Sequence, residues 1–260
     1  MNVMLFKLVA FLAVLVTGLV GGFLSVRITA FPRSERIFSF GNAFAGGIFL
    51  GAALLHMLPD AREGFQSFVT VDFPWAFFVC ACGFLLVMFT EKILMQKHED
   101  AITEAEERSG GCGFYAFVLT LVLSVHSIIA GIALGVEETI VKGAILLFAI
   151  IAHKGSATFA LGVSLHRAGI NTKRLVQIIS FFCLMTPLGI ALGSALTVFL
   201  TGKAELVFGS VFDALAAGTF LYISLLHIIE EEFIEHDARG VKFALLSFGL
   251  GMMAVLAIWL

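Results

Sequence analysis

Eight apolar stretches constrain the fold of this chain more than any other feature of its sequence. Each is close to the roughly 20 residues that an α-helix needs to cross the hydrocarbon core of a bilayer. Only 13% of the 260 residues are charged and 60% are hydrophobic, whereas soluble domains carry about 25% charged residues. The sequence therefore predicts an all-α, polytopic membrane protein. We expect one transmembrane domain over 1–260, a bundle of eight helices at approximately 4–26, 38–58, 74–95, 114–136, 142–165, 175–200, 206–229 and 241–260.

The first stretch also has to be weighed as a cleaved signal, because Lys7 precedes an apolar run. Its apolar core, Leu8 to Leu24, is longer than the core of a secretory signal, and no small-x-small cleavage site follows it. We therefore expect a retained transmembrane helix here.

Basic residues predict how the bundle is oriented. The loops after the first, third, fifth and seventh stretches carry most of them: Arg27, Arg33, Arg36, Lys92, Lys97, Arg108, Arg167, Lys173, Arg174, Arg239 and Lys242. The other loops hold only Arg62, Lys142 and Lys203. By the positive-inside rule, both termini are extracytoplasmic and the acidic loop at about 96–113 is cytoplasmic. That loop could gather cations or be a solvated linker. We expect the protein to lie in a plasma membrane or a bacterial inner membrane. The sequence has no run of basic residues that would indicate binding to nucleic acid.

Two neighbouring stretches each carry a histidine at membrane depth. His126 is followed by Ser127 in 114–136, and His153 by Lys154 in 142–165. Ionisable groups in hydrocarbon are costly, so these side chains must face the bundle interior or a watery path. Neutral imidazole is a good ligand for zinc and also for iron, nickel or copper. The pair predicts a shared metal site, and the alternative is two separate hydrogen-bonded core histidines.

A third histidine lies beside an acid near the end of the second stretch. His56 and Asp60 are four residues apart and so share one helix face, close to Pro59. They could form a cation ligand at the mouth of a path, or an interfacial histidine capped by a carboxylate. Both interpretations stay open.

The seventh stretch begins with Asp213 and ends with another histidine. His227 is one turn before Glu230 and Glu231. These acids could line an exit vestibule on the cytoplasmic side, or form an ordinary charged helix end. His227 lies deeper in apolar sequence, which favours a place on the cation pathway.

Taken together, these segments resemble the ZIP (Zrt/Irt-like) family of divalent metal transporters. The residues that carry the resemblance are His126-Ser127-x-x-x-Gly131, His153-Lys154 followed by Ala157 and Gly162, His56-Met57-Leu58-Pro59-Asp60, Pro187-Leu188-Gly189, and Ala216 to Tyr222. They occur in the family's order over nearly the whole chain. The resemblance implies a ZIP-type bundle with outside termini, a cytoplasmic third loop and metal carried into the cytosol.

The chain departs from the family where many members bind a second metal. The positions of those extra ligands hold Ala130, Ala157 and Thr186, none of which is an anionic ligand. Lys154 lies among them, and its ammonium could supply the charge of a second ion. We therefore predict a mononuclear site at His126 and His153, completed by groups such as the Ser127 hydroxyl, His56 or His227.

The expected function is divalent metal transport, with zinc taken up into the cytosol by alternating access between neighbouring bundles. We expect zinc as the main transported ion, with iron(II), manganese and cadmium as alternatives. Small residues on the ligand-bearing helices would supply the smooth faces that such movement needs: Gly131, Gly135, Gly155 and Gly162. Divalent cations and the lipid bilayer are the expected partners, and a homodimer stays open.

Two other functions would also place histidines among apolar helices. An intramembrane zinc hydrolase could use His56, His126, His153 and His227 to hold a catalytic ion. However, the chain has no His-Glu-x-x-His, and no nucleophile or general base lies beside the histidine pair in sequence. A pH-gated channel with histidine sensors would show currents far above carrier rates.

Overall fold

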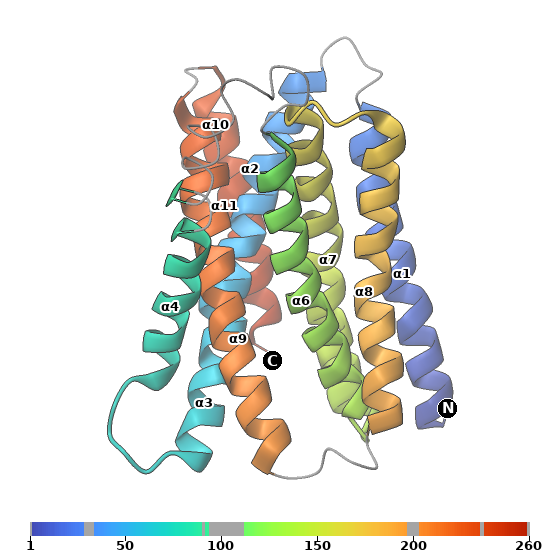
Figure 1. Ribbon diagram of the computed structural model, residues 1–260, viewed down its shortest axis with the longest axis vertical. Coiled ribbons are helices and arrows are strands. Elements are labelled where there is room, and N and C mark those ends of the chain that lie inside the picture. Colours follow the sequence, from blue (N-terminus) through green and yellow to red (C-terminus); the bar gives the residue numbers. More distant parts are fainter. Residues whose placement is uncertain are drawn as a thin grey trace.

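The computed structural model describes residues 2–28, 34–89, 92–93, 112–196, 203–234 and 237–258. These residues are helical apart from short connections, and none of them forms a strand. Most of the acidic loop predicted at 96–113 lies outside the described residues. Figure 1 shows the helices packed side by side, with both chain ends away from α10.

The helices are long enough to cross a membrane. Six helical spans of the described chain have the length and hydropathy that crossing requires, and shorter apolar helices accompany them. This confirms the prediction of an all-helical, polytopic membrane protein.

The elements are α1 (Val3–Ile28), α2 (Ser34–Ala52), the π-helical turn η1 (Ala53–Met57), α3 (Leu58–Phe68), α4 (Trp75–Phe89), α6 (Cys112–Val136), α7 (Ile140–Arg167), α8 (Thr172–Leu196), α9 (Lys203–Tyr222), the π-helical turn η3 (Ile223–Ile229), α10 (Glu230–Ile234) and α11 (Arg239–Leu256).

The helices group into two bundles. The first bundle consists of α1, α6, α7 and α8, which pack mainly against one another. The second bundle consists of α2, α3, α4, α9, α10 and α11, with η1 and η3. The two meet chiefly where α7 lies against α2, and α2 runs through the middle of the molecule (Figure 1). We refer below to the α10 end and the opposite α3 end of this assembly.

Two glycines of α6 set the packing inside the first bundle. A Cβ atom on Gly131 would overlap the carbonyl oxygen of Thr186, and one on Gly135 would overlap that of Ile190. Small residues allow this close approach of two backbones. Both glycines therefore hold α6 against α8 within one bundle. The structure thus places these two glycines against α8 rather than at the contact between the two bundles, since spacing shows close approach without showing which helix approaches.

We expect Gly131→Ala to lower the free energy of unfolding by about 1–3 kcal/mol, because the added methyl group meets backbone that cannot move aside. Gly209→Ala is the matched control. Gly209 lies inside α9, and no atom lies near the position of the new methyl group. This substitution should raise the free energy of unfolding by up to about 1 kcal/mol, because alanine favours the helix more than glycine does. Thermal midpoints in one detergent measure both, and equal shifts would count against the packing argument.

Candidate metal site

The rings of His126 and His153 face each other in the interior of the molecule. His126 lies on α6, and His153 lies at the middle of the 28-residue helix α7. At 1.5 Å per residue, each end of α7 is about 20 Å away along its axis. The ring centroids are 5.7 Å apart with their planes inclined by 51°, and both side chains are buried. The two histidines thus lie together, level with the middle of α7.

This separation suits a shared metal ion. With metal–nitrogen bonds of about 2.0–2.1 Å, an ion lies about 3 Å from the centroid of each imidazole that binds it. Two centroids 5.7 Å apart can therefore flank one ion. The Nε2 atom of His126 is buried and has no hydrogen-bond partner within the described part of the chain. An unpaired buried nitrogen is costly in a purely structural histidine, and a ligand role accounts for it.

The Lys154 ammonium lies next to the pair and is held by neutral groups. Its Nζ donates hydrogen bonds to Ser127 Oγ at 3.0 Å and to the carbonyl oxygen of Phe182 at 3.2 Å. The same Nζ lies 3.8 Å from the centroid of the Phe182 ring. Phe182 belongs to α8, the helix that also contains Pro187 in its interior. The Ser127 hydroxyl predicted as a ligand is therefore engaged by Lys154, although an oxygen lone pair remains for a metal.

One aromatic ring of the second bundle packs against both histidines. The Phe220 ring of α9 lies 4.8 Å from the ring of His126 and 5.9 Å from that of His153, measured between centroids. Phe220 is fully buried and also packs against Phe49. The pair thus belongs to the first bundle but lies at its contact with the second. Sequence analysis did not single out Phe220, because an aromatic residue in an apolar helix carries no signal of its own.

His56 lies toward the α3 end, within electrostatic range of both paired histidines. It occupies the π-helical turn η1, and its Nδ1 lies 2.9 Å from Asp60 Oδ2. The half-buried Asp213 is within electrostatic range of His56 and Asp60. The structure therefore places the predicted ligand His56 near the two predicted pathway residues Asp60, which is exposed, and Asp213.

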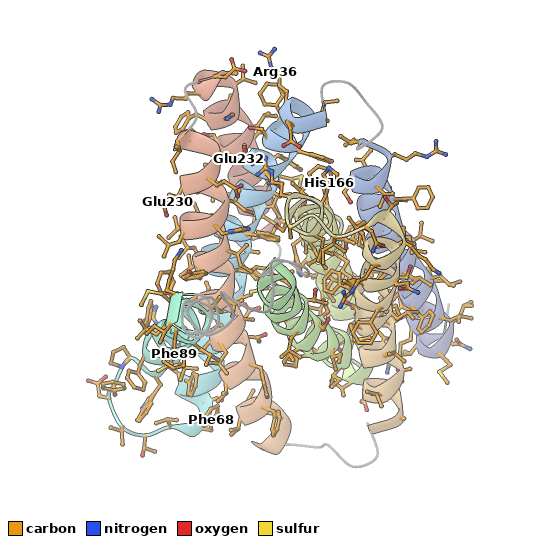
Figure 2. All side chains as sticks on the ribbon, turned by 45° about the horizontal axis from the view of Figure 1, so that its top comes forward. Arg36, Phe68, Phe89, His166, Glu230 and Glu232 are labelled. Carbon is orange, nitrogen blue, oxygen red and sulfur yellow. The ribbon has the colours of Figure 1, made fainter. Side chains whose placement is uncertain are left out.

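His227 and the acids after it lie toward the α10 end instead. His227 occupies the second π-helical turn, η3, where its Nε2 lies 3.4 Å from Ser164 Oγ of α7. Glu230 is exposed on the outside of the molecule (Figure 2), whereas Glu231 pairs with Arg167. These predicted residues are separate from the histidine pair.

The pair by itself is an incomplete coordination sphere. Within the described residues, no group of three or more His, Cys, Asp or Glu side chains lies close enough to hold a metal ion. The π-helical turns η1 and η3 each carry a histidine, and such turns occur frequently at functional sites. Hydropathy and spacing gave no sign of these turns, since a π-helical insertion leaves the apolar pattern unchanged.

Comparisons with known proteins identify the family of this chain. The chain matches the family described as ZIP zinc transporter over residues 4–113 and 95–257. It is 30% identical to zinc transporter ZIP2 of Mus musculus over 86% of each chain. It is 29% identical to zinc transporter ZIP1 of Takifugu rubripes over 96% of this chain and 97% of the relative, and 27% identical to zinc transporter 11 of Arabidopsis thaliana over 87% and 77%. The chain therefore belongs to the ZIP zinc transporter family, and it is a multi-pass membrane transporter of divalent metal rather than an enzyme.

Proposed function

We propose that this protein carries zinc across the membrane by alternating access, with His126 and His153 as the metal-binding pair. The observation that carries the proposal is the facing of these two buried rings at 5.7 Å, with the Nε2 of His126 unpaired in the described structure. Water or a backbone carbonyl would complete the coordination. Few anionic ligands make for weak binding, and a carrier must release its ion again.

A single ion at a time is the occupancy that the surroundings favour. Ala130, Ala157 and Thr186 offer no carboxylate or imidazole to a second ion. The Lys154 ammonium adds positive charge beside the pair, which opposes a second cation. We therefore propose a mononuclear site, with Lys154 in place of the second metal.

The division into two bundles suggests how access alternates. Both histidines belong to the first bundle, so movement of that bundle as one body keeps their separation while it changes which end they face. The tight contact of α6 with α8 at Gly131 would keep this bundle rigid. Ions would approach past Asp60, Asp213 and His56, then leave past His227. The basic residues expected at the cytoplasm support a cytoplasmic position for the α10 end.

Purified protein in liposomes should take up zinc down its gradient and bind close to one zinc ion per folded chain. Uptake in the presence of excess iron(II), manganese or cadmium ranks the transported ions. Bound metal per chain is measured after removal of free ions. Two ions per chain would sink the mononuclear proposal, and the absence of uptake for every ion tested would sink the transport proposal.

A further inference from the structure

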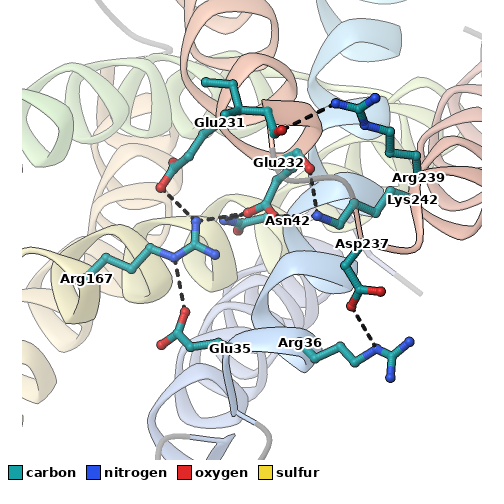
Figure 3. A network of polar contacts seen from close by, with 10 residues as sticks. Glu35, Arg36, Asn42, Arg167, Glu231, Glu232, Asp237, Arg239 and Lys242 are labelled. Atoms are coloured by element: carbon teal, nitrogen blue, oxygen red, sulfur yellow. Dashed lines mark hydrogen bonds and ion pairs between the residues drawn. The ribbon is translucent and has the colours of Figure 1, made fainter.

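One arginine ties the two bundles together at the α10 end. Arg167 ends α7, and its Nη1 donates to Glu231 Oε1 at 3.0 Å and to Glu232 Oε1 at 2.9 Å (Figure 3). Its Nε lies 3.6 Å from Glu35 Oε2. Arg167 belongs to the first bundle, whereas α10 and α2, which carry these three carboxylates, belong to the second.

The strongest of these contacts is the one to Glu232. The side chain of Glu232 is only 3% exposed, against 46% for Glu231 and 68% for Glu35. Exposed ion pairs contribute little because water screens them, whereas a buried pair loses heavily when one partner is withdrawn. Arg167 therefore owes its hold on the second bundle mainly to Glu232.

Glu232 would remain paired if Arg167 left. Its Oε1 accepts a hydrogen bond from Asn42 Nδ2 at 3.1 Å, and its Oε2 lies 3.9 Å from Lys242 Nζ. Lys242 Nζ also donates to the Glu232 carbonyl oxygen at 2.6 Å. Asn42 and Lys242 both lie in the second bundle (Figure 3). Separation of the bundles thus leaves no lone charge buried, while Arg167, already 24% exposed, can pass into water.

A polar cavity lies beside this contact. It measures about 360 Å³ and is lined by residues of both bundles, among them Arg167, Glu232 and Ser39. Ser39 is buried on α2, and its Oγ has no hydrogen-bond partner in the described part of the chain. A hydroxyl in this position is suited to water that enters when the bundles part.

We infer that Arg167 is the positioning residue that holds the α10 end of the transporter closed, and that its release from Glu232 and Glu231 opens this end. The inference rests on the proposed alternating access. The histidine pair would bind the ion, whereas the contacts of Arg167 would control whether the α10 end is open. The contact is reversible because both partners stay solvated or paired after it breaks.

Labelling of a cysteine behind the contact tests this assignment. Ser39→Cys is introduced, and the rate of its reaction with a membrane-impermeant maleimide is measured in vesicles that expose the α10 end. The same protein without Ser39→Cys gives the background from the four native cysteines. Arg167→Gln should raise the rate about tenfold, equivalent to about 1.4 kcal/mol lost from the closed state. Arg167→Lys keeps the charge and should raise it less.

Arg36→Gln is the matched control. Arg36 lines the same cavity but pairs with Asp237, inside the second bundle, at 3.7 Å. Its substitution removes the same charge and a similar volume without loosening the bundles, so the labelling rate should stay near the parent's. Equal rates in Arg167→Gln and Arg36→Gln would overturn the inference. If Arg167→Gln fails to reach the membrane, an unchanged rate in Arg167→Lys overturns it, and a raised rate supports it.

The labelling experiment needs no metal, so it separates the two proposals. If the parent protein takes up no zinc but Arg167→Gln still raises the labelling rate, the transport proposal fails and the role of Arg167 in closing the α10 end stands. If the parent protein takes up zinc and Arg167→Gln leaves the labelling rate unchanged, the transport proposal stands and the role of Arg167 fails.

Discussion

Replacing either His126 or His153 by alanine should reduce zinc uptake by about a hundredfold, on the order of the affinity lost when a metal site loses a ligand or its support. In the proposed site the two imidazoles are the main protein ligands, so each substitution removes one of them. The amount of folded protein should stay close to the parent's, because the Nε2 of His126 makes no hydrogen bond that the described fold depends on. Uptake into liposomes, normalised to inserted protein, measures the effect.

His166→Ala is the control for loss of an imidazole from the same helix. His166 lies on α7, where its ring packs 5.5 Å from that of Phe38 between centroids, near the α10 end. It is about 20 Å from His153 along the helix axis, so zinc uptake should persist. Uptake that persisted in both His126→Ala and His153→Ala would remove the site assignment.

Sequence reasoning reached the fold class and the central pair for one physical reason. A bilayer permits few spanning structures, so helix length and hydropathy alone restrict the architecture. The same medium makes an imidazole at mid-depth conspicuous, and His126 and His153 were found because each is an exception within an apolar run. Their facing in the structure follows from the need of both to avoid lipid.

Partners across the bundle could not be found in this way. The contact of Arg167 with Glu232 joins residues 65 positions apart, and no local pattern indicates such a pairing. Glu232 was also passed over among three consecutive glutamates, although it alone of the three is buried. The division into two bundles, which decides what moves against what, depends on side-chain fit between whole helices and has no short motif.

Lys154→Met should raise the stability of the fold and impair its function. The ammonium is fully buried, and no carboxylate within the described residues pairs with it; its contacts are two neutral oxygens and the Phe182 ring. The cost of burying such a charge is several kcal/mol, and the cation–π contact returns only about 2 kcal/mol. Methionine fills a similar space without charge. We expect a gain of about 1–3 kcal/mol in the free energy of unfolding.

Lys242→Met gives the opposite expectation for an equally buried lysine. Lys242 is paired with Glu232, so its loss weakens the compensation of a buried carboxylate and should cost about 1–3 kcal/mol. Thermal midpoints of the two variants in one detergent should therefore move in opposite directions. Shifts of the same sign would show that the partner's charge does not decide the outcome at these two positions.

The loss of function in Lys154→Met follows from the same charge. An ammonium beside the histidine pair repels a bound dication, which weakens binding and speeds release. Without it, zinc should bind about tenfold more tightly, a change of about 1.4 kcal/mol, and uptake should fall because release becomes slow. Zinc titration of the purified variant and uptake at saturating zinc measure the two effects. An unchanged zinc affinity would mean that Lys154 serves only the packing of α7 against α8, with no part in handling the ion.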